Sequence, residues 1–170
     1  MDLKTVIRTI PDFPEPGILF RDITPILQNG EYLREAVDLI AEALEGAEYE
    51  LIIGPESRGF IFGVPVAYNL KKGFVPVRKA GKLPCETRSK SYGLEYGKAT
   101  IEIHKDAIKP GQRVVVIDDL LATGGTCKAL AELVEEAGGV IAGMIFLIEL
   151  LELNGRKQLK GYNIQSILQY

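Results

Sequence analysis

The chain has 170 residues, a length typical of one compact domain, and residues 1–170 are expected to form a single domain. Its formal net charge of −3 argues against a surface that coats nucleic acid, which usually carries a large basic excess. No uncharged apolar run is long enough to cross a bilayer, the first residues lack a secretory pattern, and there are only two cysteines. We expect a cytoplasmic protein with reduced thiols, and neither a membrane nor a nucleic acid as its partner.

The chain begins with a proline-rich segment. Pro11, Pro14 and Pro16 fall in residues 1–30, which we expect to form an ordered arm packed over the domain. Apolar residues at helical spacing follow and predict a helix that ends at Gly46: Leu33, Val37, Ile40 and Leu44. A short apolar strand at 51–53 and a helix at 59–70 then form a β-α unit.

Between that strand and that helix lies the motif Gly54-Pro55-Glu56-Ser57-Arg58-Gly59-Phe60. Backbone N–H groups at a helix N-terminus bind anions, and arginine makes bidentate contacts to phosphate. We therefore expect Ser57 and Arg58 to bind a phosphate group. The alternative is an ordinary helix start, with Ser57 as the N-cap and Arg58 in solvent.

A basic segment follows the next predicted strand, which covers 74–77. Five cations between residues 78 and 90 face a single acid, Glu86: Arg78, Lys79, Lys82, Arg88 and Lys90. Together with Gly81 and Pro84, this composition is typical of a mobile loop and not of a helix. The segment is either a solvated surface or a flexible source of cations for an anionic substrate. Beyond it, alternating polar and apolar residues predict a half-exposed antiparallel strand at 99–104.

The most informative segment runs from Val114 to Thr126. Its β-branched start predicts a buried parallel strand over 113–117, with Asp118 and Asp119 just beyond the strand end, where open α/β sheets bind ligands. A glycine-containing turn comes next, before a helix predicted at 128–137. Such a turn binds phosphate through its backbone N–H groups. We refer to its five residues as the phosphate loop: Ala122, Thr123, Gly124, Gly125 and Thr126.

Two other phosphate-binding motifs are missing from the sequence. It has no G-x-x-x-x-G-K-[ST], which excludes a P-loop nucleotide hydrolase, and no G-x-G-x-x-G, the fingerprint of dinucleotide binding. Carboxylates repel phosphate, but an ionised Asp accepts the O–H donors of vicinal ribose hydroxyls. Phosphate in the phosphate loop and ribose on Asp118 and Asp119 would together describe a phosphoribosyl group. The alternative is a solvated Asp-Asp turn before an ordinary helix.

Two further apolar runs complete the predicted sheet, at 140–149 and at 166–170, the second as an edge strand. The alternation of strands and helices predicts an α/β fold with a doubly wound, mostly parallel sheet and right-handed crossovers. In such a sheet, the strand ends before Ser57 and before Asp118 are close neighbours, so we expect the two motifs to converge.

The segment from Val114 to Thr126 resembles, without a break, the signature of the type I phosphoribosyltransferases. Other motifs resemble the adenine-specific branch of that family: residues 11–14, 16–25, 56–60, 78–79, 81–84, 91–92, 94–98 and 166–170. The sequence departs from the family pattern around residues 85–90 and at Pro55. The resemblance implies the type I phosphoribosyltransferase fold, with an N-terminal arm and a flexible hood at residues 79–98.

The resemblance also implies the reaction. A 5-phosphoribosyl group would pass from 5-phosphoribosyl-1-pyrophosphate to adenine, giving AMP and pyrophosphate in purine salvage. Mg²⁺ is the implied cofactor, held mainly by substrate and water, with no direct protein ligand. A homodimer is implied as well.

Roles for individual residues follow from the same resemblance. Glu95, Tyr96 and Arg58 would be the catalytic residues, with Glu95 and Tyr96 over the reacting centre and Glu95 receiving the proton that adenine loses. Phe20 and Leu120 would stack on the two faces of adenine. The backbone of Leu19 and of Arg21 would read its amino edge. The residues implied to bind pyrophosphate are Ser57, Arg58, Arg78, Lys79 and Lys82.

Several alternatives stay open at this point. Phe20 is equally well explained as a core aromatic, and Glu95 as a polar residue of a hairpin turn. A transferase for another purine base would keep the phosphate loop but change the region around Phe20. A ligand-sensing regulator with this fold would bind nucleotides without releasing pyrophosphate.

Overall fold

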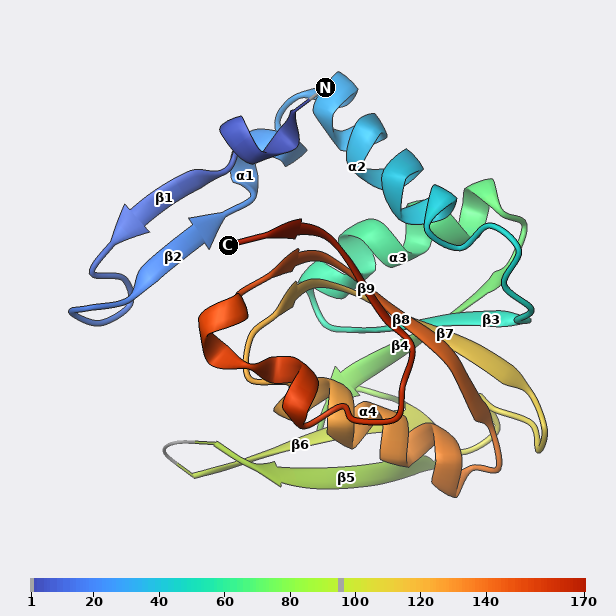
Figure 1. Cartoon of the computed structure of the whole chain (residues 1–170). Coiled ribbons are helices and arrows are strands. Elements are labelled where there is room, and N and C mark those ends of the chain that lie inside the picture. Colours follow the sequence, from blue (N-terminus) through green and yellow to red (C-terminus); the bar gives the residue numbers. More distant parts are fainter. Residues whose placement is uncertain (1, 95–96) are drawn as a thin grey trace. The chain divides into compact units, whose positions relative to one another are not determined.

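The computed structural model describes residues 2–94 and 97–170 (Figure 1). Contacts within the chain group it into two compact units, residues 1–39 and residues 40–170. The boundary lies inside helix α2 (Gly30–Glu42), beyond the end predicted for the arm at residue 30. The prediction of a single domain with an N-terminal arm over residues 1–30 stays a prediction.

The first unit is built around a β-hairpin. Strand β1 (Arg8–Pro11) pairs antiparallel with β2 (Leu19–Asp22), preceded by the short helix η1 (Leu3–Thr5) and followed by α1 (Thr24–Leu27). The turn between the strands contains Gly17 at φ +88, a conformation that favours glycine, and its N–H donates to Asp12. Near the turn, the Phe13 and Phe20 rings meet edge to face, with centroids 5.1 Å apart. The arm therefore contains ordered secondary structure of its own.

Seven strands form the sheet of the second unit, in the order β5-β6-β4-β3-β7-β8-β9. The five strands from β4 to β9 run parallel, whereas β6 is antiparallel to both β4 and β5. The strand bounds are β3 (Leu51–Pro55), β4 (Gly73–Lys79), β5 (Thr87–Gly93), β6 (Lys98–His104), β7 (Arg113–Leu121), β8 (Val140–Glu149) and β9 (Ile164–Gln169). The predicted α/β class and mostly parallel sheet are confirmed.

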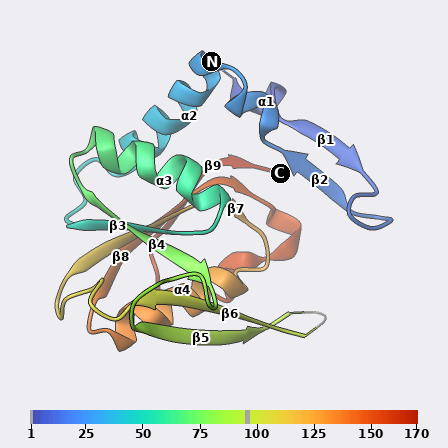
Figure 2. The same cartoon turned by 180° about the vertical axis from the view of Figure 1, so that it is seen from behind.

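Helices cover both faces of this sheet. Figures 1 and 2 show α3 (Arg58–Asn69) and α4 (Gly125–Glu136) on opposite sides of β7. The β5–β6 hairpin curls beneath α4, so that α4 lies between the hairpin and the centre of the sheet. Two short helices, η2 (Leu151–Leu153) and η3 (Gly155–Lys157), connect β8 to β9.

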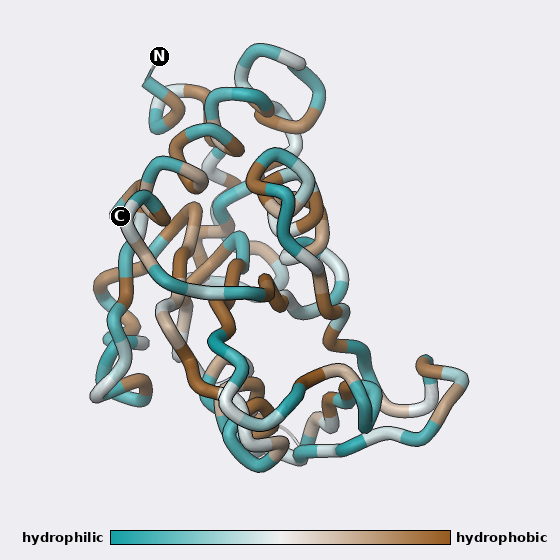
Figure 3. The backbone as a smooth tube through the Cα atoms, turned by 90° about the vertical axis from the view of Figure 1, so that its right-hand side faces the viewer, coloured by the Kyte–Doolittle hydropathy of each residue, from teal (hydrophilic) through white to brown (hydrophobic). Residues whose placement is uncertain are grey.

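Burial in the core follows from the apolar runs in the sequence. All four residues from Val114 to Ile117 are fully buried in β7, as expected for a parallel strand covered on both faces. From the neighbouring elements, Ile53, Phe146 and Leu130 contribute fully buried side chains. Figure 3 shows brown, hydrophobic stretches of the backbone alternating with teal, hydrophilic ones.

Two predictions about the elements were wrong in ways that affect the site. Strand β7 extends to Leu121, so Asp118 and Asp119 lie within the strand and not beyond it, because β8 continues alongside as a pairing partner. A mobile loop was predicted at residues 87–93, but these residues form strand β5. They do so because their backbone pairs with β6, while their side chains alternate between more buried and more exposed positions. By contrast, the strand at 140–149 and the antiparallel strand near 99–104 are confirmed.

Candidate active site

The candidate site lies where the winding of the sheet reverses direction. From the adjacent strands β3 and β7, one crossover leads through α3 to β4 on one side, and the other leads through α4 to β8 on the opposite side. The register pairs Ile53 with Val116, so the carboxyl ends of β3 and β7 lie next to each other. Ligands bind at such a switch point in open α/β sheets.

A cavity of about 250 Å³ lies at this position. Its lining comes from the two predicted motifs and the end of β7: Pro55, Glu56, Ser57, Arg58, Asp118, Asp119, Leu120, Leu121, the five residues of the phosphate loop and Cys127. The expected convergence of the Ser57–Arg58 motif and the Asp118–Thr126 motif is therefore confirmed.

Close backbone approach between the two strand ends requires two glycines. A Cβ on Gly54 would lie 2.8 Å from the Ile117 carbonyl oxygen. One on Gly59 would lie 2.7 Å from the Pro55 side chain and 3.1 Å from Asp118 Oδ1. Both glycines thus let the start of α3 pack directly against the acidic end of β7.

The phosphate loop has the geometry of an anion-binding helix N-terminus. Gly124 is the N-cap residue of α4 in the left-handed conformation, at φ +85, so α4 begins at Gly125 inside the loop and not at the predicted residue 128. Within the described chain, no side chain caps this helix end. The first turn of α4 therefore lines the cavity, and no described side chain caps its backbone N–H groups, as anion binding requires.

Asp118 and Asp119 place two adjacent carboxyl groups at the cavity wall. The Asp119 N–H donates to Asp118 Oδ1 at 2.8 Å, and the Asp119 side chain is almost completely buried. Burial raises the pKa of Asp118 well above its ordinary value, and the neighbouring charge of Asp119 adds to the rise. Burial also raises the pKa of Asp119, although Arg58 opposes the rise. Asp119 is buried and Asp118 is half-buried, so both carboxyl groups will interact strongly with a positive charge or with hydroxyl donors.

Arg58 bridges the two motifs, because its Nε lies 2.9 Å from Asp119 Oδ2. The arginine is the first residue of α3, and its side chain keeps 43% of its surface exposed. Ser57 does occupy the N-cap position of α3, as the alternative had it, but it has helical dihedral angles and makes no side-chain cap bond among the described residues, and Arg58 pairs with Asp119. Arg58 therefore contacts an acid of the β7 motif and lines the cavity.

A second cavity, of about 660 Å³, lies beside the first and shares Pro55, Glu56 and Thr126 with it. The remaining lining comes from β4 and from the hairpin: Val77, Lys79, Ala80, Tyr92, Leu94, Ala99, Thr100 and Ile101. The two cavities together offer adjoining space for the two ends of an elongated, anionic substrate.

Two sets of contacts attach the hairpin to α4. Tyr92 Oη lies 3.0 Å from Thr126 Oγ1, in the phosphate loop. Lys90 Nζ lies 3.1 Å from Glu132 and 2.6 Å from Glu136, and these acids raise the pKa of Lys90. Lys90 was counted among the cations expected to serve an anionic substrate, but it is instead paired with α4.

The other predicted cations differ in their surroundings. Arg78 Nε pairs with Glu56 Oε2, and Arg78 is the main cause of the lowered pKa of Glu56. Lys79 lines the second cavity. Lys82 is exposed and lines neither of the two cavities as described.

The predicted adenine residues belong to both units. Leu19, Phe20 and Arg21 lie in β2, where Phe20 is half-buried and Leu19 is 51% exposed. Leu120 lies in β7 and lines the first cavity. Glu95 and Tyr96 lie outside the described residues, so their roles stay predictions.

Sequence reasoning missed two residues of the site. Glu56 lines both cavities and binds Arg78, while Tyr92 connects the hairpin to the phosphate loop. Both residues belong to segments that resemble the family, at 56–60 and 91–92. Their roles depend on partners 22 and 34 positions away, a spacing that no local pattern reveals.

Across the described residues, no helix combines the length and apolarity needed to cross a membrane. Among the same residues, no group of three or more His, Cys, Asp or Glu side chains is arranged to hold a metal ion.

This chain matches a family model, related sequences and solved structures of phosphoribosyltransferases. Residues 22–168 match the model of the phosphoribosyl transferase domain. The adenine phosphoribosyltransferase of Lachnoclostridium phytofermentans is 58% identical over 168 residues, which cover 99% of this chain and 97% of that relative.

Two solved structures extend the comparison. The crystal structure of adenine phosphoribosyltransferase from Thermoanaerobacter pseudethanolicus has a TM-score of 0.97 and 56% identity, covering 99% of this chain and 98% of that one. The Saccharomyces cerevisiae enzyme, complexed with D-2,5-dideoxy-2,5-imino-altritol 1,6-bisphosphate and adenine, has a TM-score of 0.93 and 41% identity, covering 98% and 97%. This chain therefore belongs to the phosphoribosyl transferase family and, within it, to the adenine phosphoribosyltransferases.

Proposed function

We propose that this chain transfers the 5-phosphoribosyl group of 5-phosphoribosyl-1-pyrophosphate to adenine, forming AMP and releasing pyrophosphate. The observation that carries the proposal is the meeting of the phosphate loop, the Asp118–Asp119 pair and Arg58 in one cavity. Family membership at 58% identity supports the same reaction, and so does the adenine bound in the solved yeast relative.

In the proposed arrangement, the 5′-phosphate binds the backbone N–H groups of the phosphate loop, and the ribose hydroxyls bind Asp118 and Asp119. The bond from C1 of the ribose to the pyrophosphate oxygen breaks, and a bond from C1 to N9 of adenine forms on the opposite face. Positive charge develops at C1 during this exchange. The Asp118 and Asp119 carboxylates favour that charge, so electrostatic stabilisation dominates over covalent chemistry.

The departing pyrophosphate carries negative charge that cations must offset. Arg58 and Lys79 line the two adjoining cavities, which supports their assignment to pyrophosphate together with Ser57. We assign Arg78 and Lys82 to the same group on the basis of the family resemblance. Glu95, with Tyr96 beside it, receives the N9 proton of adenine, again by resemblance.

Adenine recognition is assigned to Leu19, Phe20, Arg21 and Leu120. By the family resemblance, Phe20 and Leu120 are assigned as the apolar partners of the ring. A backbone C=O of Leu19 or Arg21 accepts from the exocyclic amine of adenine, whereas a 6-oxo purine presents an acceptor there. Two facing acceptors in a closed site cost about 1–3 kcal/mol or more, which favours adenine over the 6-oxo purines.

Mg²⁺ fits the acidic character of the site, since Asp118 and Asp119 line the first cavity beside the proposed phosphate positions. We propose that substrate oxygens and water hold the ion, with no direct protein ligand. When bound, it offsets charge on the pyrophosphate.

The cellular compartment and the oligomeric state of the enzyme are proposed from the same resemblance. We assign it to the cytoplasm, where purine salvage takes place, and to a homodimer. By the same resemblance, residues 79–98 are assigned as a hood that covers the substrates and excludes water, because a sugar centre with positive character would otherwise be hydrolysed.

Direct product analysis tests the proposal. Purified protein is mixed with adenine, 5-phosphoribosyl-1-pyrophosphate and Mg²⁺, and AMP is separated and quantified over time. AMP and pyrophosphate should appear in equal amounts, and a chelator of Mg²⁺ should stop both. Binding of the substrates without any product would instead indicate a ligand-sensing regulator.

A further inference from the structure

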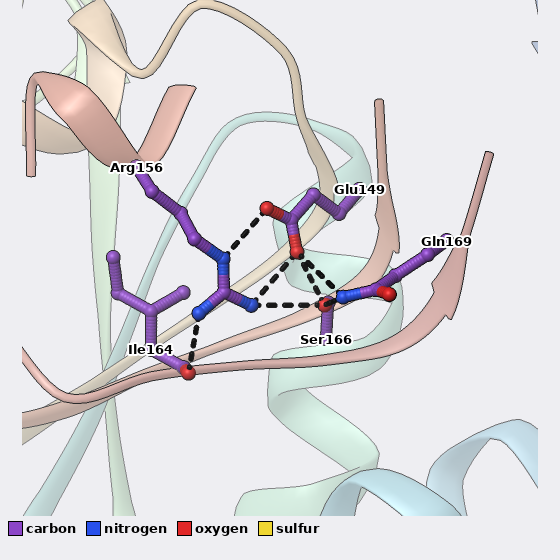
Figure 4. A network of polar contacts seen from close by, with 5 residues as sticks. All are labelled: Glu149, Arg156, Ile164, Ser166 and Gln169. Atoms are coloured by element: carbon purple, nitrogen blue, oxygen red, sulfur yellow. Dashed lines mark hydrogen bonds and ion pairs between the residues drawn. The ribbon is translucent and has the colours of Figure 1, made fainter. Parts of the chain in front are cut away.

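Outside the cavity, a buried carboxylate is surrounded by polar partners at the ends of β8 and β9 (Figure 4). Glu149, the last residue of β8, keeps only 3% of its surface exposed. Arg156 binds it through two separate contacts, Nε to Oε1 at 2.7 Å and Nη2 to Oε2 at 2.8 Å. Ser166 and Gln169 also donate to Oε2. The reaction proposed above makes no use of these four residues.

Arg156 connects three segments of the chain at this point. Its Nη1 donates to the Ile164 carbonyl oxygen at 3.1 Å, and its Nη2 lies 3.2 Å from Ser166 Oγ. Arg156 itself belongs to η3, in the connection between β8 and β9. The guanidinium thus attaches η3 to both strands. Arg156 is also the first cause of the lowered pKa of Glu149, so the carboxylate stays charged near neutral pH.

The residue before Arg156 lies directly behind the phosphate loop. Gly155 is buried, and a Cβ placed on it would overlap the Ala122 carbonyl oxygen. A Cβ placed on Gly124 would lie 2.6 Å from the Gly155 carbonyl oxygen. The backbone of η3 is therefore in contact with two residues of the phosphate loop.

Glu149 is also close to the start of that loop through the sheet. It pairs with Leu121 across β7 and β8, and the Leu150 N–H donates to the Leu121 carbonyl oxygen at 3.0 Å. The loop begins at the next residue, Ala122. A single ion pair therefore fixes η3 against the strand position from which the phosphate loop departs.

We propose that Glu149 and Arg156 are positioning residues that hold the phosphate loop in its anion-binding geometry. They act through Gly155 and contact no substrate. The inference rests on the proposed function, because it assigns the loop to the 5′-phosphate. It also gives Ser166 and Gln169 of the C-terminal motif a role, as further partners of the Glu149 carboxylate.

The proposal distinguishes the two ends of the donor. Losing the ion pair displaces the N–H groups that bind the 5′-phosphate, whereas Arg58, assigned to pyrophosphate, stands at the start of α3 and pairs with Asp119. Binding of the 5′-phosphate should weaken, and binding of pyrophosphate should not. A merely structural role would lower thermal stability and leave both affinities unchanged.

The test uses Arg156→Gln, Glu149→Gln and the double variant in the full chain, with ribose 5-phosphate and pyrophosphate as separate calorimetric probes. Each single variant should bind ribose 5-phosphate about tenfold more weakly, as expected for one weakened charge-assisted hydrogen bond. Pyrophosphate affinity should stay within about twofold of wild type. Because the two residues act as one pair, the double variant should resemble the single variants and not show the product of their effects.

Tyr162→Phe is the matched control, since it removes one hydrogen bond to Glu135, at the opposite end of α4, without touching the loop. It should lower the melting temperature and leave ribose 5-phosphate binding unchanged. Arg156→Lys keeps the charge but not the bidentate contact to Glu149, and should weaken ribose 5-phosphate binding about threefold. It serves as the test if the glutamine variants do not fold.

Two outcomes have different meanings. If wild-type protein binds ribose 5-phosphate and every folded variant binds it equally well, the positioning inference is wrong and the proposed function stands. If wild-type protein binds no ribose 5-phosphate at all, the proposed 5′-phosphate site is wrong, and the inference is overturned with it.

Discussion

Replacing Arg58 by alanine should impair the reaction and change its pH dependence. The substitution removes a guanidinium from the cavity and leaves the buried Asp119 without its partner at 2.9 Å. One charge-assisted hydrogen bond to phosphate contributes about 1.5–3 kcal/mol. We therefore expect kcat/KM for 5-phosphoribosyl-1-pyrophosphate to fall by roughly ten- to a hundredfold.

The pH effect has a definite sign. Arg58 lowers the pKa of Asp119 against the rise that burial causes, so removing Arg58 lets the pKa of Asp119 rise further. The carboxylate then takes up its proton at a higher pH than in wild type. The acid limb of the kcat/KM profile should therefore move to higher pH in the alanine variant.

Steady-state pyrophosphate release measures both effects. Adenine is kept at saturation, the donor concentration is varied, and the series is repeated from about pH 5 to about pH 9. Arg58→Lys is the matched control, because it restores a positive charge and should recover part of the activity and part of the pH shift. Near-normal kcat/KM in the alanine variant would refute the assignment of Arg58. An unchanged acid limb would refute the electrostatic coupling to Asp119.

Three more predictions concern single residues. Burial raises the pKa of Asp118, so the folded state keeps this proton to a higher pH than the unfolded chain, and stability is lost as pH rises between the two pKa values. Asp118→Asn should therefore stabilise the fold near neutral pH by about 0.5–2 kcal/mol while it lowers kcat/KM. Melting curves at acidic and at neutral pH check the effect on stability. Gly59→Ala places a Cβ 2.7 Å from Pro55 and 3.1 Å from Asp118, so it should cost about 1–3 kcal/mol in a denaturant titration; a wild-type midpoint would contradict the close packing. Glu95→Gln should lower kcat strongly with donor binding retained, and an unchanged kcat would remove Glu95 from the mechanism.

Sequence patterns predicted best where burial alone decides the structure. The strand at 140–149 was bounded correctly because its apolar run is continuous, and Val114 to Ile117 were correctly expected to be buried in a parallel strand. The end of β7 was misplaced because charged residues were taken to end the strand. Pairing with β8, a non-local interaction, keeps Asp118 and Asp119 in the sheet.

The candidate site was predictable in outline for a topological reason. Parallel strands bring their carboxyl ends to one edge, so two motifs separated by about sixty residues were expected to meet there, and they do. The pairing of Arg58 with Asp119 was not foreseen, because each had been assigned to a different part of the substrate. The support that Gly155 gives to the phosphate loop leaves no local signal, since it depends on a contact between distant backbone segments.

The hairpin at residues 87–93 shows a further limit of local patterns. Its polar composition is typical of a loop, yet cross-strand pairing with β6 makes it a strand. Lys90 is paired with two acids of α4 that lie more than forty positions further along the chain. Neither the strand nor the ion pairs can be read from the segment itself.

The central claim is tested most directly by measuring pyrophosphate release from 5-phosphoribosyl-1-pyrophosphate with a panel of bases under identical conditions. Adenine should support rapid release with AMP as the partner product, while hypoxanthine, guanine and xanthine should support little or none. Rapid release with a 6-oxo purine and not with adenine would contradict the account of base recognition. No release with any base would contradict the transferase itself.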